Sequence, residues 1–293
     1  MSENMKVHLY DVRRHASPPI EQTLIAILGT QLSNRMRTIG TTDIRLEACL
    51  PPNSANNHYP YWLVDFTNLR FRNGPGRANR IAPMTGFNLG PNDGFGEETA
   101  ALYDPQARVF IVQYNHLGPR ASGICSYINS FDHGTTHDYD FSIRIDASAA
   151  NRLNGKSILK KIDAKITPPK ISDSMRRGGT SLLKALDISD DMGGKTIEIS
   201  ISSGKSKNSK LNFQKARDFI ASLQRLMSVD GAIEKLEIKG QSTQGAAVEV
   251  IDLIEEKVEA NINNLTLGSD LRYTQASRWD GLIRARNGWN SIL

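Results

Sequence analysis

The chain has 293 residues, of which 39% are hydrophobic and 23% charged, and its formal net charge is +5. This composition is ordinary for a globular protein and provides enough apolar material for a core, which argues against disorder. No window approaches the roughly 18 consecutive apolar residues that a membrane span needs, and residues 1–14 lack the apolar core of a secretory signal. We therefore expect a soluble, cytoplasmic protein.

The two cysteines indicate a reducing compartment. Cys49 and Cys125 lie far apart in the sequence, with no CxxC or Cys/His spacing. This pattern argues against a disulfide framework and against a structural zinc site. We expect each cysteine to be a small buried hydrophobic residue.

Positive charge is unevenly distributed between the two halves of the chain. Residues 1–150 carry 13 Lys and Arg against 14 Asp and Glu, and Lys6 is their only lysine. Residues 151–293 carry 23 against 17, and most of these cations are lysines. Because the chain is also longer than a typical domain, we predict an N-terminal α+β domain (1–150) and a basic C-terminal α/β domain (151–293).

Hydrophobic patterning predicts both strands and helices in the first half. The expected elements are strand 6–14, helix 18–32, strands 41–50 and 61–71, a Gly/Pro-rich loop 73–96, strands 99–104 and 108–114, and helix 119–131. Ser17 and Pro18 are typical of a helix start. A loop as long as 73–96 is typical of a functional or mobile segment.

The last three of these elements form a β-hairpin followed by a helix. Glu97 and Glu98 fall at the mouth of the hairpin, where nothing nearby supplies the second group that a general acid or base needs. We interpret both glutamates as scaffolding. Arg120 lies in the first turn of the helix, where free backbone N–H groups and the helix dipole favour an anion, so it is a candidate phosphate contact. The alternative is a solvated arginine.

The second half alternates more regularly between the two patterns. The expected elements are strand 157–166, helix 181–188, strand 195–202, helix 213–227, strand 233–240, helix 247–262 and helix 276–289. The helix over 247–262 is predicted from Ile251, Ile254, Val258 and Ile262 at helical spacing. The chain as a whole therefore predicts an α+β (mixed α/β) fold of two domains, with mixed sheets and flanking helices.

Motifs for nucleotide hydrolysis and covalent catalysis are absent or incomplete. Three GK[ST] tripeptides occur, beginning at Gly155, Gly194 and Gly204, but each lacks the earlier glycine of a phosphate-binding loop. The sequence also lacks a GxSxG nucleophile motif and the dinucleotide-binding fingerprint. We expect no cofactor.

Two groups of carboxylates keep metal chemistry open. The segment 131–140 places Asp132, His133, His137, Asp138 and Asp140 close together, as either a weak metal site or a polar surface loop. Separately, an Mg²⁺-dependent nuclease needs carboxylates beside a lysine. Asp163 with Lys165 would meet this need, with Asp146 upstream. Glu237 with Lys239 would also meet it, with Asp218 or Asp230 upstream.

Clustered cations are the strongest functional signal in the sequence. Residues 152–184 carry nine cations against two carboxylates and residues 195–218 carry six against two, whereas residues 225–270 carry four against nine. Such segregation predicts a basic face that contacts phosphates, or, alternatively, lysines that only solubilise the domain. The candidate DNA-binding residues are Arg120, Lys156, Lys160, Lys161, Lys165, Lys170, Arg176, Arg177, Lys205, Lys207 and Lys210.

A family resemblance runs from about residue 90 to about residue 260. The segments "FGEETAALYDPQARVFIVQYNHLGPRASGICSYI", "LNGKSILKKIDAKITPP", "KTIEISIS", "KARDFI", "IEKLEIKG" and "VEVIDLIEEKV" follow one another as in the RexA-like proteins of prophage exclusion and bacterial phage defence. The resemblance implies a two-domain homodimer that binds DNA without strong sequence preference, lacks catalysis of its own and acts with a membrane effector. It implies no individual DNA contacts.

These observations favour sequence-independent binding of double-stranded DNA in a phage-defence or prophage-exclusion system. The expected partners are duplex DNA, a second copy of the chain and a defence effector, with no membrane insertion by this chain itself. Two alternatives stay open: an Mg²⁺-dependent nuclease, and a protein-interaction subunit of a defence complex that binds no nucleic acid.

Overall fold

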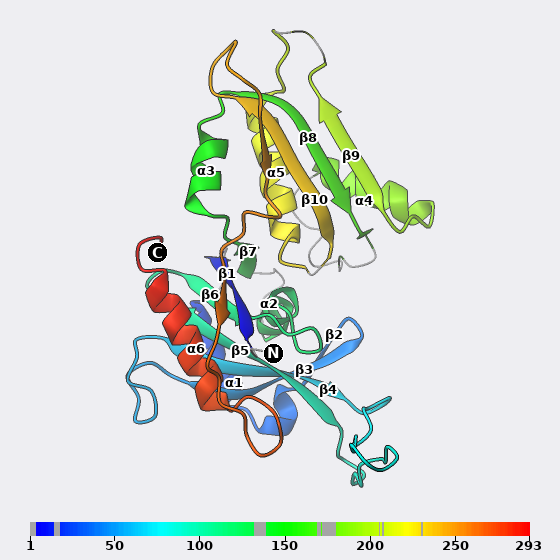
Figure 1. Ribbon diagram of the computed structural model, residues 1–293, viewed down its shortest axis with the longest axis vertical. Helices are drawn as coiled ribbons and strands as arrows, with labels where there is room; N and C mark the ends of the chain where they lie inside the picture. Colours follow the sequence, from blue (N-terminus) through cyan, green and yellow to red (C-terminus); the bar gives the residue numbers. More distant parts are fainter. Residues whose placement is uncertain are drawn as a thin grey trace.

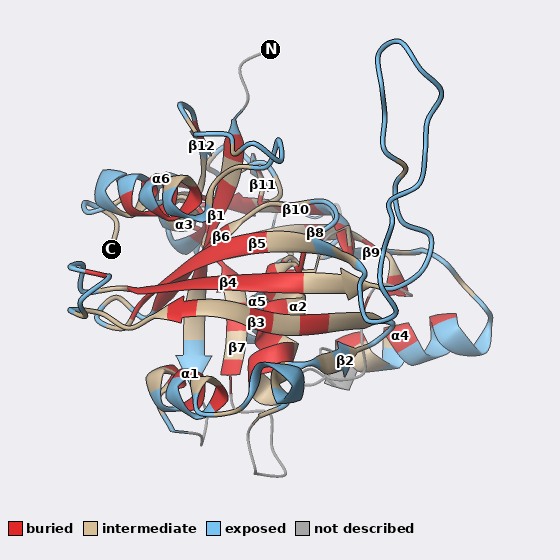
Figure 2. Cartoon of the chain, turned by 90° about the horizontal axis from the view of Figure 1, so that it is seen from below, coloured by how far each residue is buried: buried red, intermediate tan, exposed pale blue. Residues whose placement is uncertain are grey.

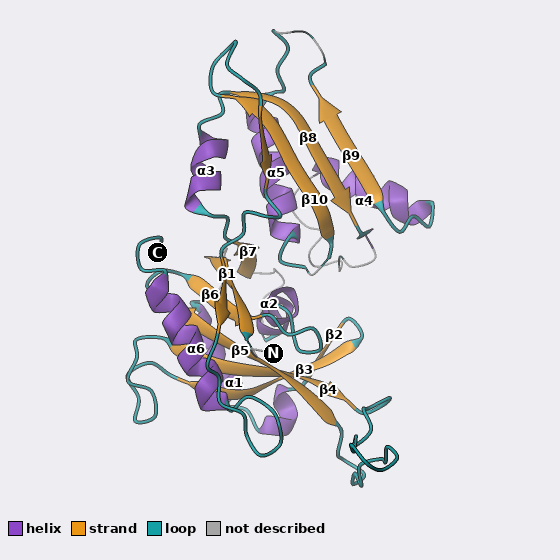
Figure 3. Cartoon of the chain, viewed as in Figure 1, coloured by secondary structure: helices purple, strands orange, loops and turns teal. Residues whose placement is uncertain are grey.

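The computed structural model describes residues 4–14, 18–131, 139–168, 171, 180–204, 206, 208–229 and 231–293. Helices pack against two sheets, so the expected α+β class is confirmed (Figure 3). We expected mixed sheets, but every described strand pairing is antiparallel. None of the described helices is long and apolar enough to cross a membrane.

The large sheet has eight strands, in the order β12-β1-β6-β5-β4-β3-β2, with β7 also paired to β1. The strands are β1 (Met5–Arg14), β2 (Arg37–Ile39), β3 (Thr42–Leu50), β4 (Trp62–Arg70), β5 (Phe95–Asp104), β6 (Val109–Gln113), β7 (Tyr139–Ile143) and β12 (Glu259–Ile262). The predicted hairpin 99–104/108–114 corresponds to β5 and β6, which pair with each other.

The small sheet has four strands in the order β11-β10-β8-β9. They are β8 (Ile158–Ile166), β9 (Ile197–Ser202), β10 (Ile233–Gln241) and β11 (Glu249–Asp252). The helices are α1 (Ile20–Leu28), η1 (Leu32–Arg35), α2 (Ala121–Asn129), α3 (Ala147–Asn154), α4 (Thr180–Asp191), α5 (Phe213–Leu226) and α6 (Gln275–Gly288). In Figure 1 the small sheet lies above the large one, with α4 and α5 behind its strands.

Strand β1 pairs with the two strands between which the chain leaves the large sheet and returns to it. Along one edge it pairs with β6; along the other it pairs with β12 through its first half and with β7 through its second. The chain leaves the large sheet after β7 and returns to it at β12, so residues 147–255, which we call the inserted segment, contain the whole small sheet. The two crossings pair with each other: Asp146 N–H donates to Glu256 O at 2.6 Å, and Val258 N–H donates to Arg144 O at 2.9 Å.

Both faces of the large sheet are covered, which explains why its central strands are apolar at consecutive positions (Figure 2). One face packs on α1 and α2, and this core continues without a break into the small sheet, α4 and α5. The other face packs on α6, where Trp279, Leu282 and Ile283 meet Leu9, Leu102 and Ile111. Cys49 and Cys125 are both buried, as expected.

The predicted helix over 247–262 is wrong. Residues 249–252 form β11 and residues 259–262 form β12, because these Val- and Ile-rich segments meet the free edges of β10 and β1. Alternation of apolar and polar residues fits the segment as well as helical spacing does, and pairing with the two sheets decides between them. Strands β2 and β7 and helix α3 were not predicted.

The last 35 residues belong with the large sheet by their contacts. The prediction grouped residues 259–293 with the C-terminal domain, but β12 pairs with β1, and α6 crosses the large sheet (Figure 1). A buried ion pair holds α6 there. The guanidinium of Arg278, 4% exposed, lies 2.9 Å from the Asp65 carboxylate on β4, 2% exposed, and also bonds Glu98 on β5. This contact gives Glu98 a structural partner.

We predict that Arg278→Met destabilises the fold by roughly 3–5 kcal/mol at pH 7.5, because Asp65 would stay buried without its cation. Burial raises the pKa of Asp65 to about 6 even with Arg278 opposing it, so without Arg278 the pKa should lie above 6, and the penalty should shrink as the pH falls toward 6 and the carboxyl of the variant takes up a proton. Urea unfolding at several pH values measures both effects. The control is Arg284→Met on the same helix, which removes an exposed pair with Asp280 and should cost less than about 1 kcal/mol. Equal losses of unfolding free energy in Arg278→Met and Arg284→Met would contradict the structural role of the buried Arg278–Asp65 pair.

Candidate functional site

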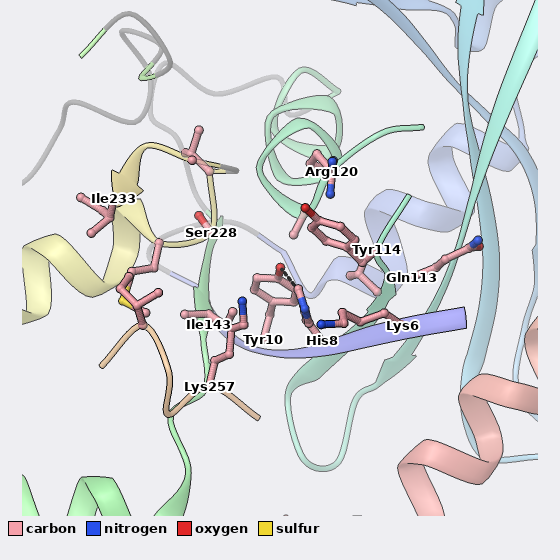
Figure 4. Close-up of a pocket in the computed structure, with 16 residues that line it drawn as sticks. Lys6, His8, Tyr10, Gln113, Tyr114, Arg120, Ile143, Ser228, Ile233 and Lys257 are labelled. Carbon is pink, nitrogen blue, oxygen red and sulfur yellow. Dashed lines mark hydrogen bonds between the residues drawn. The ribbon is translucent and has the colours of Figure 1, made fainter. Parts of the chain in front are cut away.

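A cationic cavity of about 200 Å³ lies where the inserted segment meets the large sheet. Strand β1 contributes Lys6, His8 and Tyr10 to its walls, and the segment that crosses back to β12 contributes Lys257. Figure 4 shows His8 and Tyr10 at the centre, with Tyr114 and Arg120 on one side and Lys257 and Ser228 on the other. No acidic residue is among its described lining; Asp230, between two lining residues, lies outside the described residues.

The N-terminus of α2 opens on this cavity. Arg120 is the N-cap residue of α2, its side chain does not cap the helix, and both Arg120 and Ala121 line the cavity. The first-turn N–H groups of a helix have no acceptor within the helix, and together with the helix dipole they favour an anion. The Arg120 guanidinium stacks over the Tyr114 ring at 4.0 Å and lies 3.2 Å from Nδ1 of His116, which fixes its position. Arg120 is thus at a helix N-terminus, as the sequence predicted.

One carboxylate, that of Glu259, contacts two residues of β1 and Lys257. Glu259 on β12 accepts a hydrogen bond from Lys6 Nζ at 3.0 Å and lies 3.3 Å from Nε2 of His8 and 3.8 Å from Nζ of Lys257. The antiparallel register explains this cluster, because His8 lies directly opposite Glu259. Two described cations, Lys6 and Lys257, therefore lie close to the same carboxylate.

The cluster shifts the acid–base properties of two groups. Burial lowers the pKa of His8 to about 4, the charges of Lys257 and Lys6 add to this, and Glu259 opposes it. Burial would raise the pKa of Glu259, but the hydrogen bond from Lys6 and the charges of Lys6 and Lys257 hold it below its usual value. At neutral pH, His8 is therefore neutral and Glu259 ionised.

The remaining wall of the cavity is apolar. Met227 and Val229 follow α5, Ile233 begins β10, and Ile143 and Ile254 complete the surface. The cavity wall thus combines cationic and apolar side chains. Its volume is below the roughly 300–1000 Å³ typical of sites for drug-sized ligands, so it suits a small molecule or one end of a larger one.

Of the other predicted DNA-binding residues, Lys156 is turned inward. It is 7% exposed and forms an ion pair with Glu249 on β11. Lys160 lies on β8 and donates to the Ser209 carbonyl, and Lys210 is exposed. Five more candidates, Lys170, Arg176, Arg177, Lys205 and Lys207, lie outside the described residues.

Lys161 and Lys165 lie on the outer face of the small sheet, as predicted, but within a balanced lattice of charge. In this lattice Lys161, Lys165, Lys235 and Lys239 share the face with Asp163, Glu198, Glu237 and Asp252. Lys161 pairs with Asp163 at 2.8 Å, and Lys165 with Glu234 at 2.8 Å. Paired in this way, the two lysines present much less net positive field than the sequence of β8 alone indicates.

The described residues contain no cluster of three or more His, Cys, Asp or Glu side chains arranged to hold a metal ion. In the 131–140 segment, Asp132, His133, His137 and Asp138 lie outside the described residues, while Asp140 is on β7, 3.9 Å from Arg225. Asp163 and Glu237 are cross-strand neighbours in the lattice. The nuclease alternative therefore stays a hypothesis, with these two carboxylates as its candidates.

Sequence reasoning missed most of the cavity. Lys6 stood out only as the lone lysine of residues 1–150, and Lys257 fell within a wrongly predicted helix. His8 and Lys257 are far apart in the chain and meet only because β12 pairs with β1. The pairing of β1 with distant strands gives no local sequence signal.

A family model matches most of the chain. Residues 19–269, from just before α1 to beyond β12, match the model described as a family of unknown function (DUF6731). No curated protein matches the chain.

We predict that His8 makes folding pH-dependent. The unfolded-state pKa is near 6.5 and the folded-state pKa about 4, so the unfolded chain binds the extra proton between these values. The free energy of unfolding should therefore fall by about 3 kcal/mol more in the parent protein than in His8→Gln between pH 7 and pH 4. Chemical unfolding of both proteins at half-unit pH steps tests this, and parallel curves would show that His8 has the same pKa in the folded and the unfolded chain.

Proposed function

The chain belongs to the DUF6731 family, and we propose that this member binds a small phosphate-bearing ligand in the cationic cavity. The observation that carries the proposal is that Lys6, Lys257, Arg120 and the N-terminus of α2 all line one cavity. Each of these features favours an anion by itself, and here they come from different parts of the chain and face one space.

The chemistry of the cavity favours a phosphate over a carboxylate. Lysine and arginine donors around a helix N-terminus can meet several oxygens of one tetrahedral group. His8 is neutral at pH 7, so it adds no charge beside the cations. Tyr10 Oη lies 3.4 Å from His8 Nδ1, which helps to fix the ring beside the cations.

The apolar side chains of the wall indicate that the ligand has an organic part as well as a phosphate. Ile143, Met227 and Ile254 would be left in contact with water by a bare phosphate ion. A phosphomonoester with a flat or apolar organic part would cover them, gaining roughly 25 cal/mol for each Å² of apolar surface removed from water. We therefore propose a phosphomonoester, with its phosphate beside Arg120 at the N-terminus of α2 and with Lys257 adding a positive charge from the opposite wall.

Isothermal titration calorimetry with orthophosphate, phenyl phosphate and phenol tests the proposal. We expect phenyl phosphate to bind more tightly than orthophosphate, and phenol, which lacks the anion, to bind weakly. Lys257→Met and Arg120→Gln should each weaken binding of phenyl phosphate by about tenfold or more, the effect of removing one charge-assisted hydrogen bond. The matched control Lys210→Met removes an exposed cation elsewhere and should leave binding unchanged. Equal affinity in all four proteins, or no heat with either phosphate, would contradict the proposal.

A second proposed function is sequence-independent binding of duplex DNA in a phage-defence or prophage-exclusion system. The defence role, the homodimer and an effector partner are supported by the family resemblance alone. The observation that favours DNA binding is a set of exposed cations outside the charge lattice. Lys210 and Lys215 lie beside the start of α5, and Arg72, Arg77 and Arg80 lie between β4 and β5. Contacts to phosphates through such side chains carry no sequence information.

For this function we predict that Lys210→Gln with Lys215→Gln lowers the affinity for a random-sequence duplex and reduces the slope of log K against log salt by about 2, one for each lost phosphate contact. Fluorescence anisotropy across a salt series measures both quantities. The matched control, Lys161→Gln with Lys165→Gln, removes the same charge from the lattice and should leave the slope unchanged. A larger effect in the control than in the Lys210/Lys215 variant would indicate that the DNA contacts lie on the outer face of the small sheet.

The same titration with Mg²⁺ separates the alternatives. Cleavage of the duplex, lost in Asp163→Ala or Glu237→Ala, would favour the nuclease. No binding at low salt would favour a protein-interaction subunit that touches no nucleic acid.

A further inference from the structure

The connection between β4 and β5, residues 71–94, forms an arm that extends from the body of the molecule (Figure 2). Every residue of the arm is exposed except Gly76, which is half-buried. Its exposed residues include large apolar side chains: Ile81 is 97% exposed and Met84 is 72% exposed, and Phe71, Phe87 and Leu89 are also exposed. Exposed apolar side chains gathered on one projecting element indicate a binding surface.

The arm is held at its base by aromatic packing. The Phe87 ring meets the Phe95 ring of β5 edge-on, with centroids 5.8 Å apart. Gly74 lies flat against the same Phe95 ring, so closely that a Cβ at this position would fall 1.6 Å from a ring carbon. A side chain at this position would therefore force the Phe95 ring to shift.

Beyond this base the two halves of the arm run antiparallel as a ribbon held by a single described β-bridge. Arg77 N–H donates to Thr85 O at 2.7 Å, and Thr85 N–H donates back to Arg77 O at 3.1 Å. Residues 78–84 are thus the tip, with Ile81, Pro83 and Met84 on it. The Met84 side chain packs against Gly76, where a Cβ would lie 2.6 Å from its sulfur atom.

The charged residues of the arm are mostly positive. It carries Arg72, Arg77 and Arg80 against the single carboxylate of Asp93, and it has no lysine. Among the described residues, none of the three arginines has a carboxylate within ion-pair distance, whereas Arg70 at the end of β4 pairs with Glu97. Asp93 accepts the Gly90 N–H in its own turn at 2.8 Å. The arm therefore presents arginine and bulky apolar groups together.

We infer that the arm enters the minor groove of duplex DNA, with Arg77 and Arg80 along the groove and the tip wedged between base pairs. This inference rests on the proposed DNA binding and adds the groove, the contact residues and a bend in the duplex. Arginine is favoured in narrow minor grooves, where the negative potential is strongest. Apolar Ile, Pro and Met side chains are the kind that insert between base steps and kink the duplex by roughly 20–90°.

The shape and composition of the arm favour DNA over other anionic surfaces. A membrane interface is typically met by an amphipathic helix rich in lysine, whereas this element is a ribbon without lysine. Ribbons of DNA-binding proteins enter either groove, and the arginine and apolar side chains of this arm favour the minor groove. Anionic vesicles are the competing probe in the test.

The test compares two duplexes that differ only in their central base pairs, one G·C and one inosine·C. Inosine lacks the N2 amino group that guanine places in the minor groove, while the major-groove edge is unchanged. We expect the full-length protein to bind the inosine duplex about fivefold more tightly or better. End-to-end fluorescence energy transfer should report a bend in that duplex. Vesicles of phosphatidylserine and phosphatidylcholine complete the set.

Arg77→Gln with Arg80→Gln should remove the preference for inosine, and Ile81→Ser with Met84→Ser should remove the bend while most of the affinity remains. The matched control is Arg13→Gln with Arg14→Gln, an exposed pair on β1, which should retain preference and bend. An unchanged melting temperature verifies that each variant is folded. Binding without preference or bend in the parent protein would overturn the inference and leave the DNA function standing. No duplex binding at low salt would overturn both, and vesicle binding that depends on the arm would assign the arm to lipid.

Discussion

The structure depends on the way strand β1 divides one of its edges between two partners. Strand β7 takes one half of that edge and β12 the other, and all residues of the small sheet lie between these two strands in the chain. Backbone hydrogen bonds of β1 therefore fix where the inserted segment leaves and where it returns. The pairing also decides which distant side chains become neighbours, because each residue of β12 faces a set residue of β1.

The cationic cavity follows from this arrangement and from the helix that comes after the hairpin. One wall belongs to β1 and β6, one to the start of α2, and one to the inserted segment and its return crossing. The side-chain contacts of Glu259 add to the backbone pairing between β12 and β1. They also hold Lys6 beside the cavity. The far side of the large sheet is fastened separately, by the buried guanidinium of α6.

Local patterns predicted the strands and helices well wherever burial is periodic. The hairpin of β5 and β6, the helix with Arg120 at its start and the clean alternation of β8 and β9 are each fixed by residues close in sequence. The α+β class followed from them. The segment 247–262 fits two periodicities, and only its partners in β10 and β1 decide for strands.

The candidate site was less predictable, because charge counted along a strand ignores the strands beside it. Lys161 and Lys165 look strongly basic in sequence, yet Asp163 and Glu234 pair with them in the sheet. Arg120 was found because a helix N-terminus is a local feature. Its companions Lys6 and Lys257 come together through long-range pairing, which leaves no trace in a single sequence.

The paired crossings between the two sheets link ligand binding in the cavity to the orientation of the small sheet. Residues 144–146 and 256–258 run side by side as a double connection, so the inserted segment cannot rotate without bending both. Since the cavity takes walls from each side of that connection, a rotation would also change its shape. A ligand that touches both walls must then favour one orientation of the small sheet over the others, by an amount equal to its difference in affinity between them. By reciprocity, anything that binds the small sheet and selects its orientation would change the affinity of the cavity by the same factor.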